Sequence, residues 1–328
     1  MKLLVTGGAG YIGSVVSLQL VEAGHEVTVL DNLSKGHERA VPAGARFVRG
    51  DLLDARALSR ALTPGYDGVL HFAALSLVGE SVEQPGLYYR ANVAGTLNLL
   101  DAMRDADVPR FVFSSTAAVY GEPEEVPIPE TATTRPTNPY GGSKLAVDQL
   151  IGFYARAHGL SATSLRYFNV AGASGALGED HDPETHLIPL VLEAALGEGG
   201  SVEIFGTDYS TPDGTAVRDY IHVEDLSRAH LLALEAADEA EPGEHRVYNL
   251  GNGSGFSVRE VVEAARRVTG RPIEAIEAPR RSGDPPTLVA SSALIREGLG
   301  WVPEKPDLAD MISDAWNWML EHPRGYEE

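Results

Sequence analysis

The chain contains no cysteine among its 328 residues, which excludes disulfides, thiolate metal sites, iron–sulfur clusters and a cysteine nucleophile. Its ten histidines show neither HExxH nor another metal-ligand spacing, so we expect no dedicated metal site. The sequence also lacks the uncharged apolar stretch of about 18 residues that a membrane span needs. No signal-peptide pattern accompanies the opening MKLLVTGG. We therefore predict a cytoplasmic protein with no membrane partner.

Positive charge is scarce as well. The 26 Lys and Arg residues face 47 Asp and Glu residues, which gives a formal net charge of −21. Such a chain repels phosphate backbones unless basic residues cluster, and no run of Lys and Arg does so here. We therefore expect no nucleic-acid partner. A bound diphosphate would need individual cations placed beside it.

The first half of the chain alternates short apolar runs with amphipathic stretches, a pattern typical of a parallel sheet covered by helices on both faces. One amphipathic stretch has Ile12, Val16 and Leu20 on one face and stops at Gly24. Right-handed crossovers then predict a doubly wound, Rossmann-type α/β fold. The predicted strands are Lys2–Thr6, Glu26–Leu30, Ala45–Val48, Gly68–Phe72, Arg110–Ser114 and Ala162–Arg166.

After about residue 167 the pattern loosens. Glycine, proline and polar residues dominate 171–185 and 206–215, and predicted strands and helices are interspersed. We expect two domains: residues 1–167 as a dinucleotide-binding domain and 168–328 as a smaller, irregular α/β substrate domain. Part of the second domain is expected to return and extend the first sheet.

A glycine-rich segment, TGGAGYIG, follows the first predicted strand and opens the first predicted helix. Gly7, Gly10 and Gly13 let the backbone approach a pyrophosphate, whose charge favours the helix N-terminus. Asp31 directly follows the second predicted strand. A carboxylate there accepts both ribose hydroxyls of an adenosine and repels a 2′-phosphate. The pattern predicts NAD rather than NADP, and Asp51 and Leu52 after the third strand are candidate adenine contacts.

A second motif carries candidate catalytic residues. NPYGGSK predicts a helix with Asn138 as its N-cap and Pro139 at its first position. Tyr140 and Lys144 are then neighbours on one face. A tyrosine pKa of about 10 must fall by roughly 3 units for base catalysis, about 4 kcal/mol, which one cation about 4 Å away supplies at an effective dielectric near 20. We therefore expect Lys144 and a positively charged nicotinamide to lower the pKa of Tyr140. Ser115 and Thr116, at the end of a strand, offer hydroxyls to a reacting oxygen.

These segments together carry a family resemblance. The segments TGGAGYIG, HFAALS, FSSTAAVYGEP, NPYGGSK, LRYFNVAGA, VRDYIHVEDL and RRSGDP span nearly the whole chain. They resemble the extended short-chain dehydrogenase/reductase superfamily and, within it, the UDP-glucose 4-epimerase family. The resemblance implies reversible epimerisation at C4 of a UDP-hexose through a 4-keto intermediate, with bound NAD taking and returning the hydride. Members typically pair through helices such as those expected near 92–104 and 140–157, which implies a homodimer.

The resemblance also implies roles for individual residues. Tyr140 is the base, Lys144 holds the nicotinamide ribose and tunes Tyr140, and Thr116 bonds the O4 region. The implied cofactor contacts are Gly7, Gly10, Tyr11, Ile12, Gly13, Asp31, Asn32, Leu33, Ser34, Lys35, Gly36, Asp51, Leu52, Phe72, Ala73, Ala74, Ser76, Asn92, Ser114, Tyr140, Lys144 and Phe168. The implied substrate contacts are Thr116, Tyr140, Asn169, His186, Leu187, Glu203, Phe205, Arg218, Arg281, Asp284 and Leu288, with both arginines at the diphosphate.

The sequence departs from the family at three positions. Ser76 stands where many members carry Lys, and His186 stands where Asn is frequent. Leu288 lies at a position that limits the room around C2 of the sugar and that varies in the family between a bulky Tyr and smaller residues. We expect leucine to leave enough space for some activity on UDP-N-acetylglucosamine.

The same motifs are compatible with three other functions: a nucleotide-sugar 4,6-dehydratase, a net NAD-dependent dehydrogenase or reductase, and a non-catalytic NAD-binding regulator. The dehydratase needs an acid and a base after the catalytic Thr, where this chain has Ala117 and Ala118.

Overall fold

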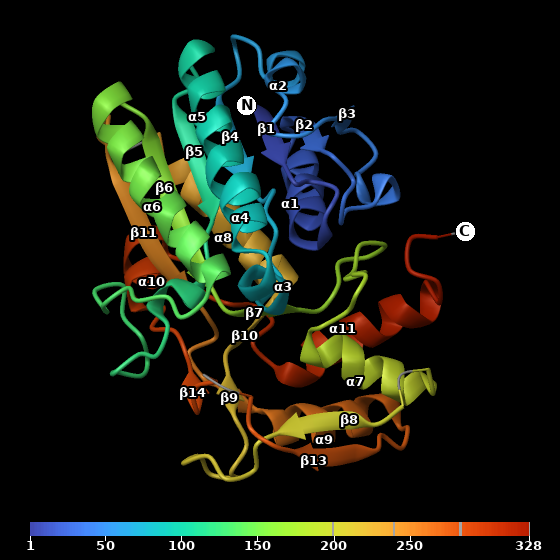
Figure 1. Ribbon diagram of the computed structural model, residues 1–328. Coiled ribbons are helices and arrows are strands. Elements are labelled where there is room, and N and C mark those ends of the chain that lie inside the picture. Colours follow the sequence, from blue (N-terminus) through green and yellow to red (C-terminus); the bar gives the residue numbers. More distant parts are fainter. Residues whose placement is uncertain (199, 239, 282–283, 328) are drawn as a thin grey trace.

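A seven-stranded parallel sheet forms the centre of the computed structural model, which describes residues 1–198, 200–238, 240–281 and 284–327 (Figure 1). All six pairs of neighbouring strands run parallel. In their order across the sheet the strands are β11 (His245–Leu250), β6 (Ser161–Tyr167), β5 (Arg110–Ser114), β4 (Gly68–His71), β1 (Lys2–Thr6), β2 (Glu26–Asp31) and β3 (Arg46–Arg49). The predicted doubly wound α/β fold is confirmed.

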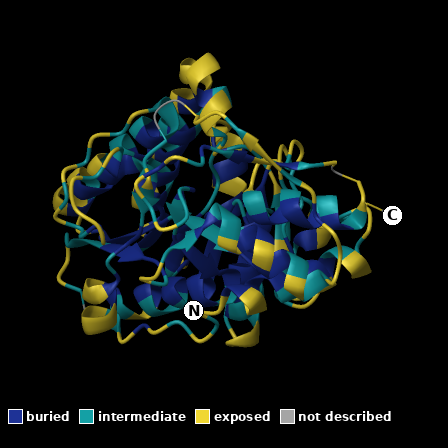
Figure 2. Ribbon diagram, turned by 90° about the horizontal axis from the view of Figure 1, so that it is seen from below, coloured by how far each residue is buried: buried dark blue, intermediate teal, exposed yellow. Residues whose placement is uncertain are grey.

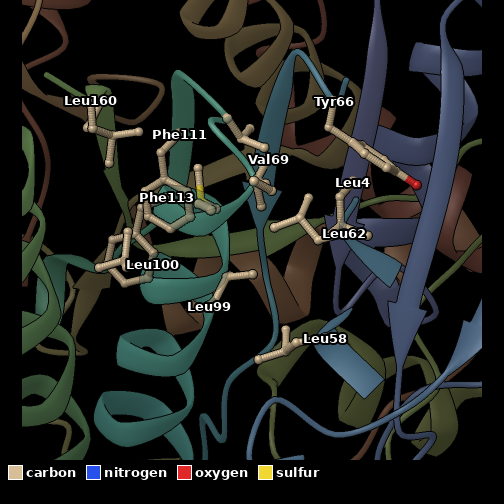
Figure 3. Close-up of a cluster of buried hydrophobic side chains, with 14 of the residues drawn as sticks. Leu4, Leu58, Leu62, Tyr66, Val69, Leu99, Leu100, Phe111, Phe113 and Leu160 are labelled. Atoms are coloured by element: carbon tan, nitrogen blue, oxygen red, sulfur yellow. The ribbon is translucent and has the colours of Figure 1, made fainter. Parts of the chain in front are cut away.

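Successive side chains of a strand point to opposite sides, so both faces of this sheet carry apolar side chains. Helices cover both faces. Leu4 packs with the helices on one face, and Leu3 and Val5 pack with those on the other. The helices on the Leu4 face are α2 (Ala55–Ala61), α5 (Gly95–Asp105) and α6 (Pro139–His158); Figure 3 shows the buried side chains between this layer and the sheet. The helices on the other face are α1 (Tyr11–Glu22), α8 (Val223–Ala236) and α10 (Ala293–Leu299).

Shorter helices occupy several of the connections between the strands. They are η1 (Glu38–Ala40), α3 (Val78–Glu83), α4 (Pro85–Tyr88), the π-helix η2 (Tyr89–Ala94) and η3 (Ala117–Tyr120). The helix predicted near 92–104 is therefore a π-helical turn followed by α5. Gly24 has a φ of +84° just after α1, as the predicted helix end requires.

The later part of the chain builds a separate core from three helices: α7 (Leu187–Leu196), α9 (Val258–Thr269) and α11 (Leu308–Glu321). A capping box between Ser257 and Glu260 fixes the start of α9. Small sheets lie beside this core (Figure 1). Their strands are β7 (Asn169–Ala171), β8 (Val202–Phe205), β9 (Val217–Arg218), β10 (Tyr220–His222), β12 (Phe256–Ser257), β13 (Ala275–Ala278) and β14 (Thr287–Leu288).

The chain passes from one part to the other more than once. β11 pairs with β6 at the edge of the central sheet, and α8 packs beside α1 on the sheet face. Figure 2 shows that the strands of the central sheet are buried and that exposed residues lie on the outer sides of the helices and on the loops. Among the described residues, no helix is both long enough and apolar enough to cross a membrane.

Candidate functional site

The candidate cofactor residues gather along one edge of the central sheet, because the carboxyl ends of parallel strands meet there. They lie at or just after the ends of the strands β1 to β6. Asn92 joins them from η2, and Tyr140 and Lys144 join them from α6. The positions at or just after the ends of these strands are Gly7–Gly13, Asp31–Gly36, Asp51 and Leu52, Phe72–Ser76, Ser114 and Phe168.

The glycine turn after β1 has space for backbone only. Gly7 has a φ of +72°, and a Cβ there would lie 2.4 Å from the Ala73 amide nitrogen. A Cβ at Gly13 would lie 2.2 Å from the Gly7 carbonyl oxygen. Gly10 is the N-cap of α1 and offers no side-chain acceptor to the first helical N–H groups. These donors lack partners within the helix, so the turn fits a pyrophosphate.

The Asp31 carboxylate lies beside this turn, at the end of β2. Its Oδ2 accepts a hydrogen bond from the Ala9 amide at 3.1 Å, and its Oδ1 accepts one from the Leu33 amide at 2.8 Å. Burial raises the pKa of Asp31, and these amide hydrogen bonds oppose the shift. Each oxygen keeps a lone pair for another donor, which matches the hydroxyl pair of a ribose. Asp31 therefore has the geometry expected for NAD.

The loop after β2 contacts two other parts of the chain. The side-chain amide of Asn32 donates to Asp51 at 2.8 Å, so the ends of β2 and β3 are joined. Lys35 donates to the Asp182 carbonyl oxygen at 2.5 Å, and a Cβ at Gly36 would lie 2.8 Å from Ala9. The candidate contacts Ser34 and Leu52 belong to these same loops.

Other candidate cofactor residues make hydrogen bonds or ring contacts with the rest of the protein. Asn92 is buried, and its side chain bonds both backbone groups of Leu75 and the Ser143 hydroxyl. The Phe72 ring packs against His230, with ring centroids 4.7 Å apart. The Tyr11 hydroxyl donates to the Gly172 carbonyl oxygen at 2.6 Å. The neighbouring candidates Ile12, Ala73, Ala74 and Ser76 share these segments.

The start of α6 has the predicted geometry. The Asn138 side chain accepts a hydrogen bond from the Gly141 amide at 2.9 Å, and Pro139 is the first helical residue. Lys144, one turn after Tyr140, is buried and donates from Nζ to the Ser114 carbonyl oxygen at 2.8 Å. Burial lowers the pKa of Lys144 to about 8, while the carboxylate of Asp148 opposes the shift.

The expected effect of Lys144 on Tyr140 is not seen in the protein alone. Burial raises the pKa of Tyr140, and the Thr116 hydroxyl opposes this shift only in part. The Lys144 ammonium group is bonded to Ser114 and makes no resolved contribution to the pKa of Tyr140. Without the nicotinamide the pKa of Tyr140 is therefore raised, and a lowered pKa in the presence of the cofactor stays a prediction. The charge that activates Tyr140 has to come with the ligands.

Thr116 lies two residues after β5 and is the N-cap of η3. Its Oγ1 accepts a hydrogen bond from the Ala118 amide at 3.1 Å. Ser115 beside it donates to Asp148 at 3.2 Å. The structure therefore brings Thr116, Tyr140 and Lys144 together at the carboxyl edge of the sheet.

A buried ion pair supports this arrangement and was not predicted. Arg166 donates from Nε and Nη2 to Asp148 Oδ2 at 3.0 and 2.9 Å, and from Nη1 to the Tyr120 hydroxyl at 3.0 Å. Asp148 follows Lys144 by four residues, so Tyr140, Lys144 and Asp148 occupy one face of α6. The spacing of these three residues was the signal available in the sequence.

Candidate substrate residues gather at the strands of the small sheets. Arg218 on β9 donates to Asp284 at 2.6 Å, and Leu288 on β14 pairs with Arg218 in the sheet register. The Arg281 guanidinium lies 3.9 Å from the centroid of the Phe205 ring. A cavity of about 550 Å³ is lined in part by Arg281 and Asp284. The Ser282 and Gly283 of the RRSGDP motif lie outside the described residues.

The other candidate substrate residues lie further along these elements. The Asn169 side chain donates to the Asp219 carbonyl oxygen at 3.2 Å. Phe168 and Leu288 pack on the same small apolar cluster. Glu203 is exposed on β8, two residues before Phe205. Leu187 begins α7 and packs on the core of that part of the chain.

His186, the N-cap residue of α7, is engaged with acidic side chains. Its Nδ1 lies 2.6 Å from Glu179 Oε1. Burial opposes the charged imidazole, but Glu179 outweighs it and raises the pKa of His186 to about 9. Burial also opposes the Glu179 carboxylate, yet hydrogen bonds from His181 and His186 lower its pKa to about 2.

Comparison with known proteins identifies the family. The model of the NAD dependent epimerase/dehydratase family matches residues 3–251. A UDP-glucose 4-epimerase of Streptomyces lividans is 60% identical, covering 100% of this chain and 98% of the relative. A UDP-glucose 4-epimerase of Corynebacterium glutamicum is 58% identical, covering 96% and 95%.

Solved structures agree with these relatives. A crystal structure of a UDP-glucose 4-epimerase, 50% identical, superposes with a TM-score of 0.97 over 100% of both chains. The structure of the Bifidobacterium longum UDP-glucose 4-epimerase in complex with NAD⁺ and UDP is 38% identical, with a TM-score of 0.92 over 99% of this chain and 100% of that chain. The chain belongs to the NAD dependent epimerase/dehydratase family.

Proposed function

We propose that this protein interconverts UDP-glucose and UDP-galactose by reversible epimerisation at C4, with NAD as its cofactor and a 4-keto sugar as the intermediate. One observation carries the proposal: Tyr140, Lys144 and Thr116 meet at the sheet edge that also carries the glycine turn, in a chain similar over its full length to UDP-glucose 4-epimerases. The shared substrate class of those relatives supports UDP-hexoses.

The cofactor is held by the residues at the carboxyl edge of the sheet. The N-terminus of α1 and the turn Gly7–Gly13 take the pyrophosphate, and Asp31 takes the adenosine ribose. Lys144 takes the nicotinamide ribose, since its Nζ lies at the end of β5 within the site. When bound, NAD supplies an acceptor for the hydride of C4 and returns it to the other face of the sugar.

The protein's own residues move the proton. Tyr140 removes the proton of the C4 hydroxyl and gives it back after the sugar has turned over. Thr116 bonds the same oxygen and keeps it near the phenol. Lys144, at a pKa of about 8, carries positive charge at neutral pH. Burial makes the phenolate of Tyr140 costly, so the positive charge of the nicotinamide is needed in addition to that of Lys144.

The diphosphate of the substrate meets Arg218 and Arg281, in a protein whose net charge of −21 otherwise opposes it. Asp284, now bonded to Arg218, takes a hydroxyl of the nucleotide. Phe205 lies under Arg281 and offers a flat face to the uracil. The remaining contacts proposed for the sugar and nucleotide are Asn169, His186, Leu187, Glu203 and Leu288.

The size of Leu288 favours a second substrate. Leu288 is partly buried against the small apolar cluster of Ala117, Val119, Tyr120 and Ile128. A leucine is smaller than the tyrosine found at this position in some members of the family that the sequence resembles. We propose that the remaining space admits the N-acetyl group of UDP-N-acetylglucosamine.

The rival functions lack support. Ala117 and Ala118, which follow Thr116, carry no group that moves a proton, so water elimination has no acid–base pair there. A non-catalytic NAD binder has no need for Tyr140 and Lys144 together. A net dehydrogenase is distinguished by experiment, because it releases NADH in stoichiometric amounts.

The direct test follows UDP-galactose conversion by the purified protein, first with no cofactor added and then with NAD⁺. We expect UDP-glucose to form to equilibrium without net NADH. Accumulation of NADH in step with substrate loss contradicts the proposal, and so does a lack of conversion while NAD is bound.

We also propose a homodimer formed by helices of the cofactor half. Large apolar side chains are exposed on this part of the surface: Val82 on α3 is 61% exposed, Leu97 on α5 is 38% exposed and Phe153 on α6 is 64% exposed. Both α3 and α5 pack on α6, so the three helices form one layer. Light scattering is expected to give a dimer for the wild type and a monomer for Phe153→Asp. A monomeric wild type contradicts the proposal.

We further propose that residues 1–167 act as the cofactor domain and residues 168–328 as the nucleotide-sugar domain. The pairing of β11 with β6 supports a return of the second domain to the sheet. We place the protein in the cytoplasm, because the proposed reaction draws on a pool of nucleotide sugars. Cell fractionation tests this placement.

A further inference from the structure

Four potential metal-ligating side chains meet in the segment that joins β7 to α7. They are Glu179, His181, Glu184 and His186. One ligand atom of each lies within 4.8 Å of the ligand atoms of the others. His186 Nδ1 is 2.6 Å and His181 Nδ1 is 3.2 Å from Glu179 Oε1, and His181 Nδ1 is 3.7 Å from Glu184 Oε2.

The two carboxylates are buried rather than displayed on the surface. The Glu179 side chain is 7% exposed and the Glu184 side chain is 8% exposed. Glu184 Oε1 accepts hydrogen bonds from the amides of Thr185 and His186, which fixes the carboxylate. No donor within hydrogen-bond distance of Glu184 Oε2 is found in the described part of the chain, where its partner is His181 at 3.7 Å. That oxygen is therefore left for a further ligand.

A cavity gives access to the cluster. It has a volume of about 200 Å³ and is lined by Glu179, His181 and Glu184, together with Trp318 of α11 and His322 just after that helix. A hydrated cation is small enough to enter such a space. The cluster is thus partly buried and also reachable from solvent.

The arrangement is close to that of a four-coordinate cation. Tetrahedral Zn²⁺ holds nitrogen and oxygen ligands at about 2.0–2.1 Å, which places the ligand atoms about 3.3 Å from one another. Three separations in the cluster, 2.6, 3.2 and 3.7 Å, lie near that spacing, and all the ligand atoms lie within 4.8 Å of one another. To bind one ion, the four side chains would have to rotate toward a common centre. Two imidazoles and two carboxylates also neutralise the charge of a divalent cation.

We propose that Glu179, His181, Glu184 and His186 form a binding site for a divalent transition-metal cation of the Zn²⁺ type. The mixed nitrogen and oxygen donors favour such an ion over Mg²⁺ and Ca²⁺, which prefer oxygen ligands alone. The site shares His186 with the contacts proposed for the substrate, and it is tested by metal binding rather than by activity. It lies within eight consecutive residues with the spacing E-x-H-x-x-E-x-H, so the proposal departs from the expectation, drawn from the sequence, of no dedicated metal site.

The position of the site gives the cation a structural consequence. The same segment bonds the loop after β2 through Lys35 on the Asp182 carbonyl and His37 on the Asp180 carbonyl at 3.1 Å. It also bonds the C-terminal segment, where the Tyr326 amide donates to Asp180 at 2.9 Å. Figure 1 shows this segment running between the central sheet and α11. A bound cation fixes the segment that joins these parts, and it stabilises the fold by mass action.

The test uses the full-length protein, stripped with EDTA and dialysed, and Zn²⁺ as the probe. Calorimetric titration is expected to give one site in the wild type and a loss of affinity of more than about 100-fold in His181→Ala. His158→Ala, which removes an exposed histidine at the end of α6, is the matched control and is expected to bind as the wild type does. Mg²⁺ is expected to give no comparable binding.

Two conservative variants and two further measurements complete the test. Glu179→Gln and His181→Asn preserve side-chain size, so they report on ligation even if His181→Ala does not fold. Zn²⁺ is expected to raise the melting temperature of the wild type, and Co²⁺ is expected to give the visible absorption of a four-coordinate site. Equal Zn²⁺ affinity in the wild type, His181→Asn and Glu179→Gln overturns the proposal, and so does a wild type that binds no Zn²⁺.

Discussion

Replacing Asp148 with asparagine tests how the catalytic helix is supported. Asp148 is 4% exposed and its partner Arg166 is 7% exposed. Three donors converge on Asp148 Oδ2: Arg166 Nε at 3.0 Å, Arg166 Nη2 at 2.9 Å and Ser115 Oγ at 3.2 Å. Asp148 Oδ1 has no hydrogen-bond partner among the described residues. The substitution therefore keeps the shape of the side chain and removes its charge.

The expected cost is large because both members of the pair are desolvated. Removing one partner of a buried ion pair costs about 3–5 kcal/mol, since the other charge stays buried. An asparagine oxygen still accepts from Arg166, so we expect the lower end, about 3 kcal/mol. The Tyr120 hydroxyl, at 3.0 Å, is the other partner of the Arg166 guanidinium and does not replace the lost charge.

The same substitution is expected to act on catalysis through Lys144. The carboxylate of Asp148 raises the pKa of Lys144, while burial lowers it to about 8. Without that carboxylate the pKa falls further, so Lys144 loses its proton at a lower pH. The alkaline limb of the kcat profile then moves to lower pH in Asp148→Asn.

Urea unfolding and pH–rate profiles measure the two effects. The control is Asp101→Asn, which breaks an ion pair with Arg104 whose side chains are both 42% exposed. Exposed pairs add little to stability, so we expect a much smaller change in the control. Equal urea midpoints for the two variants, with an unchanged pH profile in Asp148→Asn, refute this reasoning.

Three further predictions concern Lys144, the glycine turn and the sugar pocket. Burial lowers the pKa of Lys144 from 10.5 to about 8, so the folded state disfavours its ammonium form. Lys144→Met is therefore expected to raise the free energy of unfolding at pH 7 by up to about 3 kcal/mol, and this gain is expected to disappear as the pH rises from 8 to 10. The variant is also expected to lose most turnover. Urea unfolding that shows no gain in stability at pH 7 contradicts this prediction. Gly13→Ala places a Cβ 2.2 Å from the Gly7 carbonyl oxygen and is expected to weaken NAD binding at least about tenfold in a titration, whereas Gly86→Ala, with open space around it, is expected to have no effect. Leu288→Tyr is expected to suppress turnover of UDP-N-acetylglucosamine and to spare UDP-glucose; equal loss on both substrates argues against a role in selection.

The central sheet could be predicted from the sequence because each strand is a buried apolar run with a polar or glycine boundary. Lys2–Thr6 and Arg110–Ser114 match β1 and β5, and the other predicted strands of the sheet differ by one residue at one or both ends. The start of α6 was readable too, because Asn138 and Pro139 mark an N-terminus by local chemistry alone.

The side-chain environments could not be predicted, because they depend on contacts between distant segments. The pKa of Tyr140 is set by how deeply α6 is buried, and the orientation of Lys144 is set by a carbonyl on β5. The pairing of Asp148 with Arg166 joins α6 to β6. The strands β9 and β14 have two residues each, too few to show any periodicity.

The most direct test of the account compares Tyr140→Phe with Tyr154→Phe, which removes the other tyrosine hydroxyl of α6. UDP-galactose turnover is measured for both, and NAD binding is measured in parallel. The account predicts that Tyr140→Phe keeps its fold and its NAD and loses turnover by about 10²–10⁴-fold, while Tyr154→Phe stays close to the wild type. Turnover by NAD-loaded Tyr140→Phe at a rate close to that of Tyr154→Phe contradicts it.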